Sequence, residues 1–432
     1  MIFKEEVECL SQDALEALQF ERLRKLVADL DQRSPVYHQK FMAAGVTAAD
    51  LKTIHHIAKL PFTIKEDLRD NYPFGLMAAP MKDIREVHVS SGTTGNPTVV
   101  GYSKEDLDLW ADVIARSLCC GGAMPGDMIQ IAYGYGLFTG GLGLHYGSLN
   151  LGLTVIPCSS GQTKRQLKIM QDFKPRIIAC TPSYAMYMAE AAREAGIDPK
   201  GTSSKIGIFG AEPWSEAMRQ EIEKAWGITA IDIYGLSEII GPGVACECTH
   251  KNGLHFFSDV FYPEVIDPVT HKAVEPGQRG ELVITSLTKV GMPLIRYRTR
   301  DIVTIDHKTC ACGRTSPRIS KVLGRTDDMI VVRGINVFPT QIEEVLLKIE
   351  GTQPHYQIVV EREKGLDKLE VLVELEESFF SDEVKRLQDF ECRVAREIES
   401  VLSIGVKVRL VEPKTIERSE GKAKRIIDKR SL

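Results

Sequence analysis

The sequence predicts an α/β fold with a large N-terminal domain of parallel strands and helices and a small α+β C-terminal domain. Between about residues 85 and 240, short apolar runs alternate with longer amphipathic runs, which is typical of a largely parallel sheet. Beyond about residue 324, the runs follow the order β-α-β-β-α-β. The chain has 432 residues, of which 43% are hydrophobic, so it is long enough for two or more domains.

The N-terminal domain is expected to begin with a helix and to continue with short strands. Leucines at helical spacing predict an amphipathic helix over residues 11–31. Apolar runs predict strands of the parallel sheet at residues 128–132, 154–156, 176–179, 206–209 and 230–234. Residues 166–172 and 216–226 are expected to lie in the helices between them.

The pattern changes twice in the second half of the chain. Strands punctuated by glycine and proline predict a small β subdomain over residues 253–322. A boundary is expected near Gly324, which gives domains of residues 1–324 and 325–432. The second domain is expected to contain strands at 329–332, 356–361, 369–375 and 406–411, and helices at 340–349 and 382–402.

Charge and hydropathy exclude several classes of protein. The formal net charge of −5 gives no reason to expect binding to nucleic acid or to a membrane surface. No apolar run reaches the ~20 residues of a membrane span, and the first residues lack the apolar core of a signal peptide. A cytoplasmic protein is therefore expected.

Ten cysteines divide into two groups. Six lie in or beside apolar segments and are expected to be reduced core residues. The others form two Cys-x-Cys pairs in turn-like surroundings, which in a cytosolic chain favours a metal over disulfides. Structural zinc takes four N or S ligands. The expected set is Cys248, His255, Cys310 and Cys312, with Cys246 as an alternative to His255, and free surface thiols are the other interpretation.

The most informative motif is a loop of hydroxyl residues and glycines between two apolar runs, Ser90-Ser91-Gly92-Thr93-Thr94-Gly95-Asn96-Pro97. Glycines allow backbone N–H groups to approach phosphate oxygens, and the hydroxyls add further donors. The order of residues is not that of a Walker loop. The loop therefore predicts a polyphosphate site of another kind, with a surface turn as the alternative.

With further segments in a fixed order, the chain resembles adenylate-forming acid–CoA ligases, and specifically phenylacetate–CoA ligases. The segments are His88–Pro97, Gly210–Trp214, Tyr234–Glu238, Tyr297–Asp301, Gly324–Pro339 and Gly421-Lys422. The subfamily signal lies in Tyr133–Gly141 and Arg333–Pro339. The match covers most of residues 85–432, and it implies a large adenylate-forming domain and a small mobile C-terminal domain.

The resemblance implies a two-step reaction that uses ATP, CoA and Mg2+. A carboxylate first displaces pyrophosphate from the α-phosphate of ATP, and the thiol of CoA then attacks the acyl-adenylate. The residues implied to bind the nucleotide are Ser90, Ser91, Gly92, Thr93, Thr94, Gly95, Gly210, Ala211, Glu212, Pro213, Asp232, Ile233, Tyr234, Gly235, Ser237, Asp301 and Arg325. Among them, Asp301 is implied to bind the ribose hydroxyls, with Arg298 or Arg300 as ion-pair partners if its role is structural.

Two residues are implied to act directly on the reacting groups. Glu238 is implied to coordinate Mg2+ between the phosphates, since carboxylates suit hard cations. Lys422 is implied to contact the carboxylate and the α-phosphate during adenylation, and Lys424 is its rival. Asn96 departs from the family, which usually has Lys at this position.

The resemblance also implies a domain movement and an acyl pocket. Asp327 matches the hinge position, while Arg333 and Gly334 are expected to approach the CoA channel. The pocket is expected to be formed by Tyr135, Phe138, Gly140, Gly141 and Trp214. An aromatic acid such as phenylacetate is the expected substrate, which would place the protein in aromatic-acid degradation. The segment Ser148-Leu149-Asn150 departs from these relatives, so the acid itself stays open.

Two other functions are consistent with the motifs. The acyl group could pass to the thiol of a carrier protein in place of CoA. The second alternative is a module that binds nucleotide and acid without turnover, and only Asn96 supports it. The expected assembly is a homodimer, and the zinc is expected to be structural.

Overall fold

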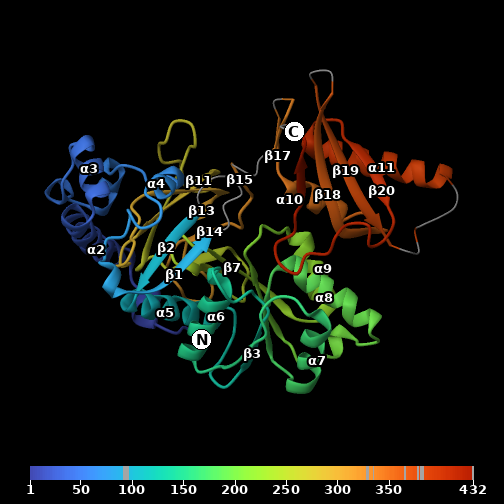
Figure 1. Ribbon diagram of the computed structural model, residues 1–432, viewed down its shortest axis with the longest axis horizontal. Coiled ribbons are helices and arrows are strands. Elements are labelled where there is room, and N and C mark those ends of the chain that lie inside the picture. Colours follow the sequence, from blue (N-terminus) through green and yellow to red (C-terminus); the bar gives the residue numbers. More distant parts are fainter. Residues whose placement is uncertain are drawn as a thin grey trace.

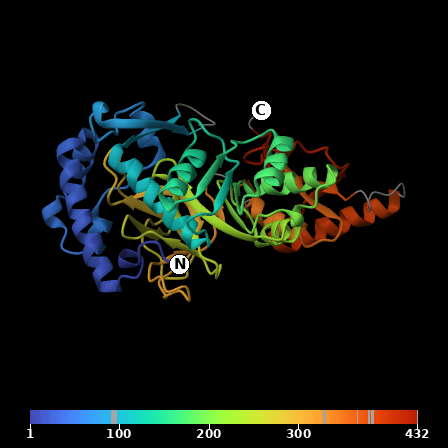
Figure 2. The ribbon, with the colours of Figure 1, turned by 90° about the horizontal axis from the view of Figure 1, so that it is seen from below.

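The computed structural model describes residues 1–90, 97–326, 330–333, 335–363, 366–376, 379 and 384–430. Within these ranges, no helix is both long and apolar enough to cross a bilayer. A large N-terminal domain and a small C-terminal domain lie side by side, and the two views in Figures 1 and 2 agree on this arrangement. The C-terminal domain, in orange and red, lies at the end of the molecule opposite the first helices of the chain.

A nine-stranded sheet forms the centre of the N-terminal domain. Its parallel half has the order β4-β3-β5-β6-β7, and its antiparallel half continues from β7 as β8-β9-β14-β13. The parallel strands are β3 (Met128–Ile131), β4 (Thr154–Pro157), β5 (Ile177–Cys180), β6 (Ile206–Gly210) and β7 (Thr229–Leu236). The antiparallel strands are β8 (Gly241–Glu247), β9 (Leu254–Phe256), β13 (Ile305–Asp306) and β14 (Arg318–Ile319). The five strands predicted from apolar runs are therefore all present.

Both faces of the parallel half are buried, which explains its continuous apolar runs. Along β5, Ile177 and Ala179 belong to one hydrophobic core, and Ile178 and Cys180 belong to the other. The covering helices are α5 (Lys104–Cys120), α6 (Thr139–Leu151), α7 (Thr163–Phe173), α8 (Pro182–Glu194) and α9 (Glu216–Trp226). α5 contributes Trp110 and Ile114 to the first core, while α7, α8 and α9 pack on the second.

A second, four-stranded antiparallel sheet has the order β10-β11-β12-β15. Its strands are β10 (Phe261–Ile266), β11 (Gly280–Ser286), β12 (Tyr297–Val303) and β15 (Gly324–Arg325). The predicted β subdomain at 253–322 therefore has no sheet of its own that contains all its strands. Because β9 and β14 pair with each other and β9 pairs with β8, the strands β9, β13 and β14 extend the nine-stranded sheet.

The N-terminal helices and one hairpin complete this domain. The helices are α1 (Glu5–Glu8), α2 (Gln12–Arg33), α3 (Pro35–Ala44) and α4 (Lys65–Asp70), with 3-10 turns at Ala48–Asp50, Ile54–Lys59, Met81–Asp83 and Pro199–Gly201. α2 covers the helix predicted at 11–31 except for its first residue, Ser11, whose hydroxyl caps the helix by accepting from Ala14 N. The hairpin of β1 (Ile84–Ser90) and β2 (Thr98–Ser103) flanks the glycine-threonine loop.

The C-terminal domain is an α+β unit with the sheet order β20-β19-β18-β21. Its elements are β16 (Ile330–Val332), β17 (Ile335–Val337), α10 (Pro339–Leu346), β18 (Thr352–Glu363), β19 (Leu366–Leu375), α11 (Val384–Leu402), β20 (Lys407–Val411) and β21 (Ile426–Asp428). The predicted order lacked two strands. Among the residues described, the first strand, β16, pairs with β17 alone in a hairpin, and β21 pairs in parallel with β18.

The contact between α5 and α6 predicts a sharp difference between two glycines of α6. A Cβ atom on Gly147 would lie 2.1 Å from Cγ2 of Ile114, whereas one on Gly140 would lie 3.5 Å from Tyr133, an ordinary contact. We expect Gly147→Ala to destabilise the fold by about 1–3 kcal/mol through overpacking. Gly140→Ala is the matched control, because a helical Ala is favoured over Gly. Thermal unfolding of the two variants checks this, and equal midpoints would contradict the packing.

Candidate active site

The carboxyl ends of β5, β6 and β7 meet at one edge of the nine-stranded sheet. The register of the parallel strands places Cys180 beside Phe209 and Gly210 beside Ile233. The residues that follow these strands include Thr181, Glu212 and Glu238. Ligands of open α/β sheets bind at this edge, so the residues after the three strands form the candidate site.

The C-terminal turn that carries Lys422 docks on this edge. The carbonyl of Gly421 accepts hydrogen bonds from the hydroxyls of Thr181, at 3.0 Å, and Ser183, at 3.2 Å. The backbone N–H of Ala423 donates to Oε2 of Glu212 at 2.9 Å. Lys422 lies between these two anchored residues, and its side chain is exposed. The fold therefore brings Lys422 to the ends of β5 and β6, although some 200 residues separate them in the sequence.

The sequence did not predict which residues form hydrogen bonds with this turn. Thr181 caps α8 by accepting from Tyr184 N, and the same hydroxyl donates to the Gly421 carbonyl. Glu212 was expected to line the nucleotide and acyl pocket, but its carboxylate also accepts from Ser183 N, at 2.8 Å, and from Ala423 N. A Thr-Pro-Ser cap after a predicted strand was the available signal. This signal predicts the start of a helix, but it does not predict that the Thr181 and Ser183 hydroxyls bind the Gly421 carbonyl.

Two glycines of the predicted nucleotide set are required by the packing of strands. A Cβ on Gly210 would lie 2.2 Å from the carbonyl oxygen of Ile233, and one on Gly235 would lie 1.9 Å from that of Gly241. Ala211, next to the first glycine, has a φ of +71°. The side chains of Ala211 and Pro213 are both exposed. The chain thus turns sharply after β6, and this turn presents Glu212 at the edge.

Asp301 lies in a buried polar group with Tyr234 and Arg325. The Tyr234 hydroxyl donates to Oδ2 of Asp301 at 2.6 Å, and Nη1 of Arg325 donates to Oδ1 at 3.0 Å. Burial, followed by the Asp301 charge, raises the pKa of Tyr234 well above its usual range, so this hydroxyl stays a donor. Arg298, one of the alternative partners, binds Glu281 instead. The pairing of β12 with β15 thus brings Asp301 beside Arg325, and Tyr234 reaches Asp301 from β7.

Glu238 is buried in the turn that follows β7. Neighbouring groups hold the backbone of this turn: the Tyr102 hydroxyl donates to the Ser237 carbonyl at 3.3 Å, and the Lys289 ammonium donates to the Ile239 carbonyl at 2.8 Å. The Ser237 hydroxyl also lies 3.1 Å from that of Thr139 at the start of α6. The carboxylate therefore stands on a turn with a fixed backbone.

Most of the phosphate loop lies outside the described residues. These are Ser91, Gly92, Thr93, Thr94, Gly95 and Asn96, and the same is true of the hinge residue Asp327 and of Gly334. Ser90 ends β1 opposite Thr98, and its buried hydroxyl has no hydrogen-bond partner among the residues described. Arg333 is exposed in the β16–β17 hairpin, where it donates to the Gly405 carbonyl at 2.6 Å.

The predicted acyl residues fall into two places. Tyr135 packs on the first core, and its hydroxyl lies 3.3 Å from Nδ1 of His145, while Phe138 remains 48% exposed. A Cβ on Gly141 would lie 2.6 Å from the Gly134 carbonyl, so this glycine lets α6 approach the 134–135 backbone. Trp214 belongs to the second core, away from Tyr135.

Trp214 and Asp232 instead border a buried group of charged residues. The Lys321 ammonium lies 4.0 Å from the Trp214 ring centroid, and Arg219 binds Glu247 at 2.7 Å. Burial, and then the nearby Glu247 charge, raise the pKa of Asp232 to about 7. This carboxyl therefore lies in a charged interior beneath α9, on β7, the strand that also carries Tyr234.

The four expected metal ligands come together at the far end of the antiparallel strands. Cys248 follows β8, His255 lies in β9, and the loop between β13 and β14 carries Cys310 and Cys312. The pairing of β9 with β14 holds that loop beside His255. One donor atom from each of the four residues lies within 4.8 Å of the others.

The distances in this group fit a tetrahedral metal site. The sulfurs of Cys248 and Cys310 are 3.8 Å apart, and Sγ of Cys312 is 3.4 Å from Nε2 of His255. Zinc–sulfur bonds of about 2.3 Å at tetrahedral angles place two sulfurs about 3.8 Å apart, far beyond a disulfide bond. Cys246 lies outside the group, because its sulfur contacts the Ser117 carbonyl of α5 at 3.4 Å.

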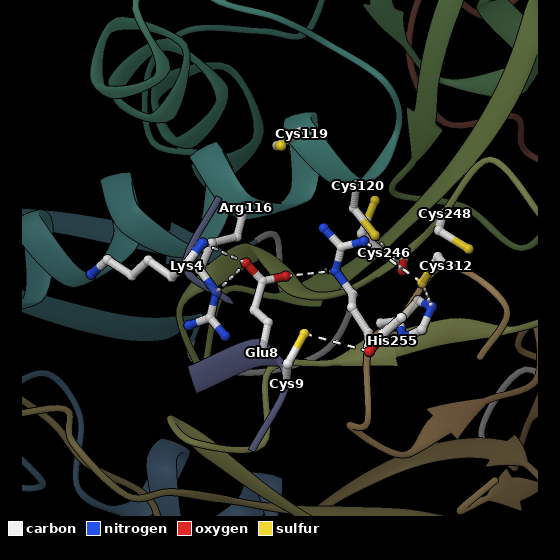
Figure 3. Close-up of polar contacts among 12 residues, drawn as sticks. Lys4, Glu8, Cys9, Arg116, Cys119, Cys120, Cys246, Cys248, His255 and Cys312 are labelled. Carbon is white, nitrogen blue, oxygen red and sulfur yellow. Dashed lines mark hydrogen bonds and ion pairs between the residues drawn. The ribbon is translucent and has the colours of Figure 1, made fainter. Parts of the chain in front are cut away.

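Arg314 connects this group to Glu8 in the first helix of the chain. Figure 3 labels Glu8 together with Cys248, His255 and Cys312 of the group. Nη1 of Arg314 donates to Sγ of Cys312 at 3.7 Å, and its Nε donates to Glu8 at 2.6 Å. Burial raises the pKa of the Cys312 thiol, but hydrogen bonds from Arg314 outweigh it and leave the pKa lowered. Burial also lowers the pKa of His255 to about 3, so the imidazole is neutral and able to bind a metal.

Comparison with known proteins agrees with the motifs. Residues 16–289 match the AMP-binding enzyme family, and residues 334–430 match the AMP-binding enzyme C-terminal domain. The phenylacetate-coenzyme A ligase of Thermus thermophilus is 49% identical and covers 100% of both chains. That of Escherichia coli K12 is 47% identical and covers 99% of this chain and 97% of the relative.

A solved 2-hydroxyisobutyryl-CoA ligase shares the arrangement of the two domains. Its postadenylation state, in complex with 2-HIB-AMP, has a TM-score of 0.94 at 30% identity and covers 99% of this chain and 92% of the other. Its thioesterification state, with 2-HIB-AMP and CoA, has a TM-score of only 0.73. The domain arrangement described above is therefore closer to that of the postadenylation structure than to that of the thioesterification structure.

The expected resemblance is thus confirmed by both sequence and structure: the chain belongs to the AMP-binding enzyme family and, within it, to the family of phenylacetate–CoA ligases.

Proposed function

We propose that this protein is an AMP-forming ligase that joins phenylacetate, or a closely related arylacetic acid, to CoA. In the first step, a carboxylate oxygen of the acid attacks the α-phosphorus of ATP, and pyrophosphate leaves. In the second step, the CoA sulfur attacks the acyl carbon and AMP leaves. The observation that carries this proposal is the docking of the Lys422 turn on the carboxyl edge, through Gly421 and Ala423.

In the first step, Lys422 supplies the positive charge. Negative charge gathers on the α-phosphate as the carboxylate approaches, and a positioned ammonium offsets it at that moment. Gly421 and Ala423 are both anchored to the N-terminal domain, so the lysine backbone is fixed before the reactants meet. Lys424, its rival in the sequence, follows the anchored Ala423 and is also exposed.

Asp301, Tyr234 and Arg325 would hold the sugar and the base. The Asp301 carboxylate has two oxygens and can accept from both ribose hydroxyls. Tyr234 and Arg325 already bind one oxygen each, which fixes the plane of the carboxylate before the nucleotide enters. Asp301 is 4% exposed, so only a ligand that enters the site would reach it.

Glu238 would hold Mg2+ against the phosphates. A carboxylate is a preferred oxygen ligand of this cation, which keeps several of its waters and takes further oxygens from phosphates. The position of Glu238 on a turn held by Tyr102 and Lys289 supports this role. When bound, the cation would neutralise the charge of the leaving pyrophosphate.

The second step would need the C-terminal domain to move. In the present arrangement, the Lys422 turn lies over the edge where the adenylate forms, and the β16–β17 hairpin with Arg333 is exposed to solvent. A rotation about the residues near Asp327 would withdraw Lys422 and bring this hairpin toward the acyl group. The two states known for the 2-hydroxyisobutyryl-CoA ligase support such a movement.

The cysteine group would hold a structural zinc ion. Three thiols and one neutral imidazole form a donor set that zinc prefers, and the distances among them fit a tetrahedral site. His255 lies on β9, and Cys310 and Cys312 lie in the loop between β13 and β14. These three strands are only two or three residues long, and a metal would tie them to Cys248 after β8. The homodimer and the cytoplasmic location remain predictions from the sequence.

We expect Lys422→Ala to lower acid-dependent pyrophosphate release by about 100-fold or more, the effect of removing one donor that stabilises transition-state charge. Release is measured with Mg-ATP and a panel of arylacetic, benzoic and fatty acids, with and without CoA. Phenylacetate is expected to give the highest CoA-stimulated rate in the unmodified enzyme. Lys424→Ala is the matched control and should retain most activity.

The same assay separates the alternatives. Release without any acceleration by CoA would point to another thiol, such as that of a carrier protein. Binding of ATP and acid without release, in the unmodified chain, would favour a sensing module. Equal losses in the two lysine variants would contradict the role given to Lys422.

Zinc content gives an independent prediction. We expect the purified chain to contain stoichiometric zinc by elemental mass spectrometry, and Cys312→Ser to lose most of it and to unfold at a lower temperature, because binding energy in a structural site contributes to folding. Cys392→Ser changes an exposed cysteine of α11 and should alter neither measurement. A chain that stays free of zinc after incubation with the metal would refute the site.

A further inference from the structure

Two carboxylates of the C-terminal domain cap a helix of the N-terminal domain. Oε1 of Glu343 accepts from the backbone N–H of Ser215 at 2.9 Å, and Oε2 of Glu344 accepts from that of Ala217 at 3.2 Å. Both acceptors lie on α10, which lies beside α9 in Figure 1. The first N–H groups of a helix have no partner within it, and negative charge is favoured there.

The cap within α9 itself is incomplete without these carboxylates. The Ser215 hydroxyl accepts from Met218 N at 3.1 Å, which satisfies a single donor of the first turn. The N–H groups of Ser215 and Ala217 find their acceptors in the other domain. Movement of the C-terminal domain would therefore leave these two donors to water.

Glu343 also reaches the turn that carries Lys422. Nη2 of Arg425 lies 3.4 Å from Oε2 of Glu343, and the guanidinium lies 4.4 Å from the Tyr356 ring centroid. Arg425 follows Lys422 by three residues. One carboxylate thus contacts both the start of α9 and the base of the catalytic turn.

The balance of energies suits a contact that must break in each cycle. Glu343 is 3% exposed, and burial raises the pKa of its carboxyl. Removing a carboxylate from water is costly, and the Arg425 charge and the Ser215 hydrogen bond offset that cost. When the domains separate, water again solvates the carboxylate. The net energy of the contact is therefore small, although its geometry is specific.

We propose that Glu343 and Glu344 form a clasp on the N-terminus of α9 that holds Lys422 in place for adenylation and is released for transfer to CoA. Glu343 is a positioning residue in this scheme, because it acts through Arg425 and α9 and touches no reacting atom. Glu344, which is half-buried and also binds Lys348 at 2.8 Å, contributes less. The inference rests on the proposed two-step reaction.

The test measures the two half-reactions separately. Adenylation is followed by phenylacetate-dependent exchange of pyrophosphate into ATP, and transfer by thioester formation from CoA and preformed phenylacetyl-adenylate. We expect Glu343→Gln to slow exchange by about tenfold, as for a weakened charge-assisted hydrogen bond, and Glu343→Ala to slow it further. Transfer should stay at least as fast as in the unmodified enzyme. Glu344→Gln should show the same direction with a smaller change.

Controls make the result decisive. Glu350→Gln changes an exposed carboxylate just beyond α10 and should leave both half-reactions unchanged. Thermal unfolding establishes that each variant is folded, and Glu344→Gln tests the clasp if the Glu343 variants do not fold. Equal slowing of both half-reactions, or no slowing of exchange, would overturn the clasp. Absence of exchange in the unmodified chain would instead refute the proposed reaction.

Discussion

The carboxylate of Glu212 is the interaction on which the site depends, because its two oxygens bind backbone groups from different domains. One accepts from Ser183 at the start of α8, and the other accepts from Ala423 beside Lys422. This side chain therefore acts together with the Thr181 and Ser183 hydroxyls, which hold Gly421, to fix the lysine at the carboxyl edge. The strained turn at Ala211 and the absent side chain of Gly210 place that carboxylate where both donors reach it.

Several buried ions pair with a counter-ion from a distant part of the chain. Arg116 of α5 binds Asp259 at 2.8 Å, Arg314 binds Glu8, and Arg219 binds Glu247. Truncating one member of such a pair leaves the other charge buried and uncompensated, which costs far more than the pair contributes. These pairs fix the relative positions of the first helix, α5 and the loops after β9, and they hold α9 against β8.

The sequence was sufficient to predict the elements with long, regular patterns. The parallel strands were recognisable because both faces are buried, and the amphipathic α2 because its leucines recur on one side. The strands β17 and β21 were missed, since three residues carry no periodicity. The division of residues 253–322 between two sheets depends on pairing, which composition does not reveal.

The residues of the candidate site likewise divide into those that motifs predicted and those that only the structure shows. Motifs identified Lys422, Asp301 and Glu238, because these residue types recur in a fixed order with glycines and hydroxyls. The residues that bind the Lys422 turn could not be predicted, since the hydrogen bond between Thr181 and Gly421 joins residues 240 positions apart. Trp214 was assigned to the acyl pocket from its aromatic character. The structure shows its ring in the second core, and its place in the pocket stays a prediction.

The four residues Cys248, His255, Cys310 and Cys312 lie where the antiparallel half of the large sheet ends. The outer strands β14 and β13 have two residues each, so they offer few free backbone groups to another chain and protect against edge-to-edge aggregation. Such short strands hold little pairing energy of their own. A metal bound by Cys248 and Cys310, 62 residues apart, would close a long loop and reduce the entropy of the unfolded chain. A metal bound by the four residues would thus keep the short strands at the end of the sheet paired.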